Sequence, residues 1–243
     1  MQASAIVVAG GLGARMGASL EKPFIEVCGV PMLLFSLEAF QRCEAVSEIV
    51  LVLFKGGEKR LRSPAKMPVK MPAKMDRFSK LTRTVQGGPR RQDSVFNGLL
   101  ACDERADVVV IHDAARPMLR VEWIASGIEA LGDCAGAVYA APATDTLKRA
   151  GPDGIVRETV SRENLYEVQT PQVFRKDWLL RAHEHARAQG LAATDDAELV
   201  EAIGGKIRIL PGNPWNLKIT FADDLVVANA LLSKRSREWF ASE

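Results

Sequence analysis

The sequence predicts an α/β protein built on a mainly parallel sheet, and three observations support this prediction. Apolar runs of strand length alternate along the chain with segments that have the periodicity of an amphipathic helix. Residues 6–8, 49–53 and 108–111 are continuous runs of valine, isoleucine and leucine, which is typical of strands covered on both faces. Glycines and charged residues follow the first and third runs, at the sheet edge where such proteins bind ligands.

The individual elements follow in order from this alternation. Strands are expected at 4–10, 48–54, 107–113 and 135–143. Helices are expected between them, at 31–43, 90–103 and 121–131. Beyond residue 170 the pattern predicts helices at 176–189 and 195–203, a strand at 206–210 and a last helix at about 222–232. The second of these later helices is opened by Thr194, Asp195 and Asp196, an N-cap signal.

Residues 142–169 interrupt the alternation. Their sequence is largely polar, and Gly-Pro-Asp-Gly at 151–154 is a turn between two half-apolar segments that are able to form a hairpin. Because this segment does not look like core, we expect it to be an inserted arm that packs on another subunit.

Length and composition bound the domain organisation. A chain of 243 residues that is 47% hydrophobic can bury the core of one α/β domain, so residues 1–243 are expected to form a single domain. Neither a signal peptide nor a membrane span is indicated, and we expect a cytoplasmic protein without a membrane partner. The four cysteines lack metal-site spacing and are expected to be buried as small apolar residues.

Basic residues are concentrated in residues 55–80. This segment holds nine Lys or Arg and only two Asp or Glu, although the net charge of the whole chain is +2. It repeats Pro-x-Lys-Met from Pro64, Pro68 and Pro72, and proline at every fourth position blocks a helix. We therefore expect an extended or mobile insertion, with an anionic partner as the less favoured alternative. Nucleic-acid binding is not predicted. A nucleic-acid-binding protein should have basic residues spread over a folded face, whereas here they are concentrated in one segment.

The stretch VVAGGLGARMG, residues 7–17, passes from a strand into glycine. It is not a P-loop, because no Gly-Lys-Ser/Thr follows at the required spacing. It also fails the dinucleotide fingerprint, because Met16 stands where the third glycine belongs. Successive unshielded N–H groups still form an anion nest, and Arg15 and Lys22 add positive charge on the same connection. These features favour a phosphate-binding loop over a simple tight turn.

Asp113 and Arg116 follow the apolar run 108–111 directly. A carboxylate at a strand end that faces bound phosphates is a natural ligand for Mg²⁺, although a turn or helix cap is the alternative. His112 is expected to pack in the core rather than to bind a ligand. His183 and His185 are two residues apart on an expected helix and cannot share a face, so no role is assigned to them.

Further candidate residues lie near other element boundaries. Gly88 and Ser94 belong to a Gly-Gly turn that opens a helix, where they could read a base edge. Arg162 and Lys218 each lie in a segment that also carries a threonine. Several basic side chains and one carboxylate at such boundaries are typical of a phosphoryl-transfer site, where catalysis is positioning plus charge stabilisation.

These motifs together resemble those of the 2-C-methyl-D-erythritol 4-phosphate cytidylyltransferases. The segments that match in order, over nearly the whole chain, are AGGLGARMG, GGPRRQDSVFNGL, IHDAARP, DTLKR, QTPQVF, TDDAELVE and NLKIT. The resemblance implies a Rossmann-like nucleotidyltransferase fold with a mainly parallel central sheet and a protruding β-arm that exchanges across a homodimer. It implies that CTP and methylerythritol phosphate are joined, with Mg²⁺ or another divalent cation, into the cytidine diphospho-alcohol, with release of pyrophosphate.

The resemblance also implies roles for individual residues. Arg15, Lys22 and Lys218 would act on the phosphates as catalytic residues. CTP would be bound by Ala9, Gly10, Gly11, Gly13, Gly88 and Ser94. The methylerythritol phosphate site would comprise Asp113, Arg116, Thr146, Arg162, Thr170 and Thr194. Asp113 would hold the metal ion, and Arg162, which lies on the arm, could serve the partner subunit.

Two departures and two alternatives accompany this resemblance. Glu21-Lys22-Pro23-Phe24 keeps the family's lysine but places a carboxylate beside it. The Pro-x-Lys-Met insertion has no counterpart in the family pattern. A ribitol-5-phosphate or related polyol-phosphate cytidylyltransferase would share the glycine loop. A catalytically silent nucleotide-binding protein would be expected to lose Lys22, Asp113 or Lys218, all of which are present.

Overall fold

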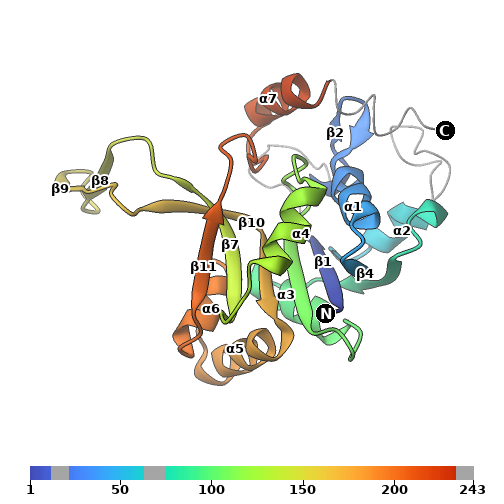
Figure 1. Ribbon diagram of the computed structural model, residues 1–243. Coiled ribbons are helices and arrows are strands. Elements are labelled where there is room, and N and C mark those ends of the chain that lie inside the picture. Colours follow the sequence, from blue (N-terminus) through green and yellow to red (C-terminus); the bar gives the residue numbers. More distant parts are fainter. Residues whose placement is uncertain (12–21, 63–74, 234–243) are drawn as a thin grey trace.

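One seven-stranded sheet organises the chain (Figure 1). The computed structural model describes residues 1–11, 22–62 and 75–233. The strand order across the sheet is β11-β7-β10-β6-β1-β4-β5. These strands are β1 (Ala3–Ala9), β4 (Val46–Leu53), β5 (Leu81–Gln86), β6 (Val108–Asp113), β7 (Gly136–Pro142), β10 (Tyr166–Arg175) and β11 (Ile207–Pro211). All neighbouring strands are parallel except β10, which is antiparallel to β6 and β7. The expected α/β fold with a mainly parallel sheet is confirmed.

The centre of the sheet is buried on both faces, as its continuous apolar runs predict. In β1, Val7 packs in one core cluster and Ile6 in the other. In β4, Leu51 and Val52 divide between the same two clusters. Because successive side chains of a strand point to opposite faces, both faces of these strands must be apolar, which explains the absence of alternation.

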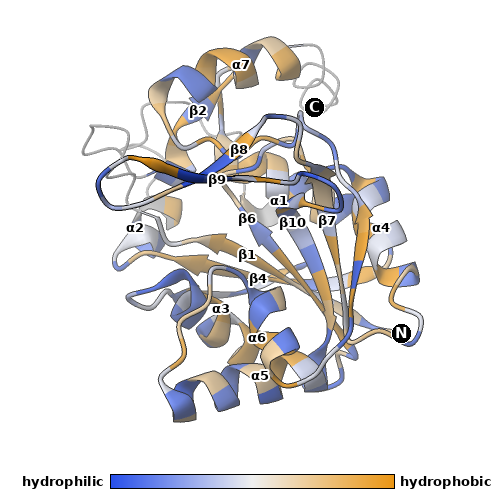
Figure 2. Cartoon of the chain, turned by 90° about the vertical axis from the view of Figure 1, so that its left-hand side faces the viewer, coloured by the Kyte–Doolittle hydropathy of each residue, from blue (hydrophilic) through white to orange (hydrophobic). Residues whose placement is uncertain are grey.

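Helices cover the two faces of the sheet. They are α1 (Met32–Arg42), α3 (Arg91–Leu100), α4 (Val121–Glu129), α5 (Lys176–Gln189) and α6 (Asp196–Ala202). Helices α1 and α4 lie on one face, and α3, α5 and α6 lie on the other (Figure 2). All five agree with the helices expected from the sequence to within a few residues at their ends. None of the described helices is both long enough and apolar enough to cross a membrane.

A third cluster forms beside the main sheet. Helix α7 (Ala222–Leu232) packs over the short pair β2 (Glu26–Val27) and β3 (Val30–Pro31). The buried residues Phe35 and Ile219 belong to the same cluster, so α7, the last described helix, packs against residues 25–35. In the loop before α7, Lys218 and Ile219 bond to Asp113 and to the Ala115 carbonyl, so this part of the loop lies at the carboxyl end of β6.

The arm is a hairpin that projects from the sheet (Figure 1). Strands β8 (Leu147–Ala150) and β9 (Val156–Val160) pair only with each other, and Gly154 has φ +76° in the turn between them. The protruding arm expected in residues 142–169 is therefore present. Its last four residues differ from expectation, because residues 166–169 already belong to β10 of the main sheet.

Regular structure extends into the basic insertion from both sides. Helix α2 (Gly57–Arg62) follows β4, and a 3₁₀ turn at Met75–Arg77 precedes β5. The expectation of an irregular segment over 55–80 is therefore wrong at its two flanks, because the first helix-blocking proline, Pro64, comes only after α2. The remainder of the Pro-x-Lys-Met repeat lies outside the described residues.

Candidate active site

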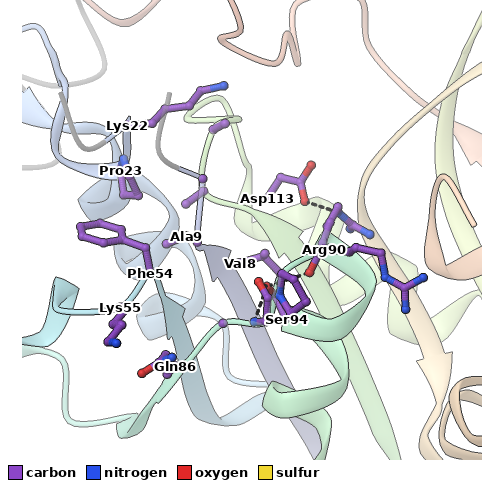
Figure 3. Close-up of a pocket in the computed structure, with 18 of the residues that line it drawn as sticks. Val8, Ala9, Lys22, Pro23, Phe54, Lys55, Gln86, Arg90, Ser94 and Asp113 are labelled. Atoms are coloured by element: carbon purple, nitrogen blue, oxygen red, sulfur yellow. Dashed lines mark hydrogen bonds and ion pairs between the residues drawn. The ribbon is translucent and has the colours of Figure 1, made fainter. Parts of the chain in front are cut away.

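A pocket of about 700 Å³ lies at the carboxyl ends of β1, β4, β5 and β6. Ala9, Gly10 and Gly11 line it at the end of β1, and Gln86 and Gly88 line it after β5. Figure 3 shows Lys22 and Asp113 toward one end of this pocket and Lys55 and Gln86 toward the other. The pocket therefore combines glycine backbone at two strand ends with the basic side chains of Lys22, Lys55 and Lys218, which suits an elongated anionic ligand.

The turn before α3 is shaped by close packing of its glycines. A Cβ on Gly88 would lie 2.4 Å from the Cβ of Asp93, so only glycine fits there. The Gly88 N–H donates to Ser94 Oγ at 3.1 Å, and Ser94 Oγ donates to the Arg90 carbonyl at 3.1 Å. The turn is thus closed onto the first residues of α3, with the Gly88 backbone and Ser94 in the pocket wall.

A second pocket, of about 550 Å³, lies beside the first. It contains Arg116 from the loop after β6, Thr170 and Gln172 from β10, and Thr194 from the segment before α6. Strand β10 runs antiparallel to β6, so Thr170 reaches the same sheet edge as the carboxyl end of β6. Asp113 lines this pocket too, so four of the six residues that the sequence resemblance assigns to the second substrate, Asp113, Arg116, Thr170 and Thr194, lie together here.

Among the residues that the structure describes, three line both pockets: Arg91, Asp113 and Lys218. Arg91 Nε donates to Asp113 Oδ1 at 2.8 Å, and Lys218 Nζ donates to Asp113 Oδ2 at 2.6 Å. These three side chains form the shared wall. Burial alone would raise the pKa of Asp113, but the charges of Arg91 and Lys218 outweigh it and hold that pKa well below its ordinary range. The carboxylate is therefore ionised.

Buried polar contacts hold the shared wall from beneath. The Asp113 N–H donates to Thr170 Oγ1 at 3.1 Å, which in turn is 3.0 Å from His112 Nδ1. His112 Nε2 lies 3.0 Å from the Arg116 carbonyl. This pattern assigns the neutral Nε2–H tautomer, because Nδ1 accepts and Nε2 donates. Burial lowers the pKa of His112 to about 4, in agreement with the expectation that it is a core residue.

The loop that carries Lys218 is anchored on β10. Asn216 is fully buried and its Nδ2 donates to the Thr170 carbonyl at 2.8 Å. Arg116 Nη1 donates to the Asn216 carbonyl at 2.6 Å, so a residue of the second pocket also holds this loop. The backbone of Ile219 continues the anchor by donating to the Ala115 carbonyl at 2.9 Å. Lys218 is thereby fixed opposite Asp113 although 105 residues separate them.

The shared wall offers one carboxylate to a divalent cation. The described residues contain no group of three or more His, Cys, Asp or Glu side chains able to hold a metal ion. Asp113 is the carboxylate of the shared wall, and each of its oxygens accepts one hydrogen bond from a cation. A carboxylate oxygen has two lone pairs, so each keeps one acceptor position. One carboxylate with phosphate oxygens and water suits Mg²⁺, and the residues present fit this ion.

The remaining residues that the sequence predicts for the site fall into three groups: outside the described residues, outside the two pockets, or in the first pocket. Gly13 and Arg15 lie outside the described residues. Thr146 and Arg162 are exposed on the arm, and neither lines the two pockets, although Arg162 donates to the Thr144 carbonyl. Lys22 lies in a 3₁₀ turn (Lys22–Phe24) in the first pocket, so the neighbouring proline has not removed it from the site.

Sequence reasoning missed Arg91, Asp196 and His183 as members of the site. Arg91 is part of a quoted motif, but its partners are 22 and 105 residues away, and no local pattern reveals them. Asp196 was interpreted only as part of an N-cap signal. The cap itself is Asp195, which accepts from the Glu198 N–H at 3.0 Å, while Asp196 is buried beneath the shared wall.

Two adjoining pockets that share Arg91, Asp113 and Lys218, at the carboxyl edge of a mainly parallel sheet, are the arrangement expected of an enzyme that transfers a group between two phosphate-bearing substrates. The 2-C-methyl-D-erythritol 4-phosphate cytidylyltransferase family matches residues 3–234 of the chain. The protein of that name from Pelotomaculum thermopropionicum is 41% identical over 234 residues, which are 96% of this chain and 94% of the relative. The chain belongs to this family, and it is a nucleotidyltransferase.

Solved structures agree with this assignment. The 4-diphosphocytidyl-2C-methyl-D-erythritol synthase of Anaerococcus prevotii superposes with a TM-score of 0.79 and 31% identity, covering 95% of this chain and 96% of that one. The 2-C-methyl-D-erythritol 4-phosphate cytidylyltransferase of Thermus thermophilus superposes with a TM-score of 0.75 and 32% identity, covering 96% and 100%. The fold and the family therefore point to the same class of enzyme.

Proposed function

We propose that this enzyme transfers the cytidylyl group of CTP to 2-C-methyl-D-erythritol 4-phosphate, giving 4-diphosphocytidyl-2-C-methyl-D-erythritol and pyrophosphate. The observation that carries the proposal is the shared wall. Two separate pockets meet at Arg91, Asp113 and Lys218, as a reaction between two bound phosphates requires. The family names the two substrates, and the pockets supply one place for each.

The first pocket is assigned to CTP. Its Gln86–Gly88 end, closed by Ser94, is proposed to hold the cytosine. The glycine segment at the end of β1 and Lys22 form the end assigned to the triphosphate. A Cβ on Gly11 would meet no atom of the described residues within 4 Å, so none of them fills the space beside it. Arg15 is proposed to extend this phosphate-binding loop.

The second pocket is assigned to the methylerythritol phosphate, with Arg116, Thr170 and Thr194 as its binding residues. An oxygen of the acceptor phosphate would form a bond to the α-phosphorus of CTP. The bond from that phosphorus to the bridging oxygen would break, and pyrophosphate would leave with the electron pair. No general base is required, because a phosphate monoester is already ionised near neutral pH.

Catalysis then consists of bringing two anions together. Lys218 lies on the shared wall, and its ammonium group would neutralise charge that develops at the α-phosphate. Arg91 and Lys218 also hold Asp113, so the wall keeps a fixed arrangement of charge before substrates bind. Preorganised charge of this kind stabilises a transition state without reorganisation during the reaction.

Asp113 is proposed to hold Mg²⁺ or another divalent cation together with the phosphates. Such an ion, when bound, would draw phosphate oxygens together and reduce the repulsion between the two substrates. The role of Asp113 in the protein is to present an ionised oxygen at the junction of the two pockets.

The arm is proposed to complete a homodimer. Ile155, Val156 and Leu165 are large apolar residues that the arm leaves exposed in the single chain, which favours a protein surface as their partner. Thr146 and Arg162 lie on the same arm and outside both pockets. They are proposed to contribute to the acceptor site of the other subunit.

Pyrophosphate release by the purified protein with a divalent cation tests the function. Turnover is expected with CTP and methylerythritol phosphate, and not with ATP or UTP in place of CTP. A preference for ribitol 5-phosphate would keep the chemistry but overturn the assigned acceptor. Binding of CTP without turnover of any pair would support a silent nucleotide-binding protein instead.

A further inference from the structure

A buried line of ion pairs and hydrogen bonds continues from the shared wall into the protein. Beyond Asp113, the Arg91 Nη1 group donates to Asp196 Oδ2 at 2.7 Å. Asp196 Oδ1 in turn lies 3.2 Å from His183 Nε2. The line therefore joins Lys218, Asp113, Arg91, Asp196 and His183, which come from five different parts of the fold.

Asp196 cannot act on a substrate directly. It is fully buried and lines neither pocket. Burial favours the neutral acid, but the charge of Arg91 and the hydrogen bond to His183 hold the pKa of Asp196 below its ordinary value. A buried carboxylate is costly unless it is paired, and both of its oxygens are engaged here. Its influence on the reaction must pass through Arg91.

The guanidinium of Arg91 fixes the geometry between the two carboxylates. Its Nε bonds to Asp113 and its Nη1 bonds to Asp196, so two edges of one rigid plane are held at once. A guanidinium held at two positions cannot rotate without breaking one contact. The location of Asp196 therefore determines how Arg91 meets Asp113, and which Asp113 oxygen is left for Lys218.

We infer that Asp196 is a positioning residue for the transfer reaction: through Arg91 it sets the orientation of the Asp113 carboxylate between the two substrate pockets. The inference rests on the proposed function for its effect on turnover. His183 supports Asp196 from the opposite side, where its ring stacks on Phe96 with 5.7 Å between the ring centroids. No substrate contact is assigned to Asp196 or His183.

Steady-state kinetics of Asp196→Asn, Asp196→Glu, Arg91→Lys and the Asp196→Asn/Arg91→Lys double variant test this inference. Asp196→Asn is expected to lower kcat about tenfold or more, with the KM for CTP changed by less than about threefold. Asp196→Glu keeps the charge but moves the carboxylate, so it is also expected to lower kcat. In the Arg91→Lys background, Asp196→Asn should cause little further loss, because both changes break the same contact.

Glu48→Gln is the matched control. Glu48 is also a buried carboxylate, and Ser4 and the Asp103 N–H bond to it, but it lies at the amino ends of the strands, away from both pockets. Its substitution is expected to lower the thermal unfolding temperature without lowering kcat per folded molecule. An Asp196→Asn variant that behaves in the same way, or losses that multiply in the double variant, would overturn the inference.

A second measurement does not depend on turnover. NMR of the Arg91 Nε–H in the wild-type protein and in Asp196→Glu should show faster exchange with solvent in the variant. Unchanged exchange would overturn the inference even if the proposed substrates were wrong. Wild-type protein that releases no pyrophosphate from CTP and methylerythritol phosphate would instead count against the proposed function, so the two failures are distinguishable.

Discussion

At the scale of single residues, the site depends on charged groups that are held before any substrate arrives. Asp113 has a cationic nitrogen on each oxygen, and a threonine hydroxyl accepts from its backbone N–H. Removing one partner from a buried pair is strongly destabilising, because it leaves a charge without compensation. The same contacts that keep Asp113 ionised therefore also fix its position between the pockets.

Gly11→Ala separates binding from stability. A Cβ at this position meets no atom of the described chain within 4 Å, so the free energy of unfolding should be nearly unchanged. The added methyl group would occupy space proposed for a phosphate, and the KM for CTP should rise about tenfold, equivalent to about 1.4 kcal/mol. Chemical unfolding and initial-rate kinetics measure the two quantities. A destabilised protein with an unchanged KM would refute the assignment.

Gly88→Ala is the contrasting variant. Its Cβ would approach the Asp93 Cβ to 2.4 Å, so the turn before α3 must shift. We expect this variant to lose about 1–3 kcal/mol of stability as well as CTP affinity, because overpacking forces backbone movement. If the Gly11 and Gly88 variants were equally stable, the claim that only Gly88 is closely packed would be wrong.

His112 should make the protein sensitive to mild acid. Burial lowers its pKa to about 4, so between pH 6.5 and 4 the unfolded chain binds a proton that the folded chain does not. Stability from this residue is complete above pH 6.5 and is lost as the pH falls; about 2 kcal/mol should disappear between pH 7 and pH 5. Urea unfolding of the wild type and of His112→Asn at pH 7 and pH 5 measures this loss of stability. If His112→Asn lost as much free energy of unfolding as the wild type, the effect would not come from His112.

At the scale of elements, α3 connects the core to the site. Its first residue is Arg91 of the shared wall, and Ser94 lies one turn later in the first pocket. Toward its other end, Gly98 brings the helix close to β1 and β4, where a Cβ would lie 2.7 Å from Ile6 Cγ2 and 2.9 Å from Val52 Cγ2. The close approach at Gly98 therefore helps fix the distance between α3, which carries Arg91 and Ser94, and the sheet.

Gly98→Ala should destabilise the protein despite a better helix propensity. The substitution gains about 1 kcal/mol in the helix, whereas forcing two buried methyl groups apart costs about 1–3 kcal/mol. We expect a net loss of about 1–2 kcal/mol, because both contacts are to rigid central strands. Leu100→Ala, at a largely exposed position of the same helix, should change stability by less than about 0.5 kcal/mol. Thermal or urea unfolding that ranks the two variants in the opposite order would contradict this packing argument.

The elements themselves were largely predictable from the sequence. In long periodic segments the predicted helix bounds agree with the structure. The helix predicted at 176–189, for example, is α5, which spans the same residues. Strand β5 was missed because its sequence, Leu-Thr-Arg-Thr-Val-Gln, is only half-buried and lacks an apolar run. The antiparallel direction of β10 was also not foreseen, because direction depends on how the arm returns the chain to the sheet and not on local pattern.

At the scale of the whole molecule, the chain gathers its site from distant segments. Glycine motifs and charged residues at strand ends identified Lys22, Asp113 and Lys218, because a parallel sheet brings strand ends together. The contacts of Arg91 with Asp113 and Asp196 could not be predicted, since they depend on side-chain directions across the packed core. Arg15 and Gly13 stay predictions, because they lie outside the described residues.

The proposed dimer can be tested by mixing two inactive variants. If Arg162 serves the partner's site, a heterodimer of Arg162→Ala and Lys218→Ala chains contains one intact site. An equimolar mixture that exchanges freely should then recover about one quarter of wild-type activity, because about half the dimers are mixed and each has one active site. Light scattering verifies the dimer. No recovery from two inactive chains that do exchange would place Arg162 in its own chain's site, and an active Arg162→Ala variant would place it outside both sites.

The most direct test of the shared wall is the rate of pyrophosphate release by Lys218→Ala at saturating CTP and methylerythritol phosphate. Lys218 lines both pockets and bonds to Asp113, so its loss should remove charge stabilisation from the transition state. The account predicts a fall in kcat of about 10²–10³-fold, as for loss of one preorganised donor. A kcat within about tenfold of the wild type would contradict the claim that the two substrates react at this wall.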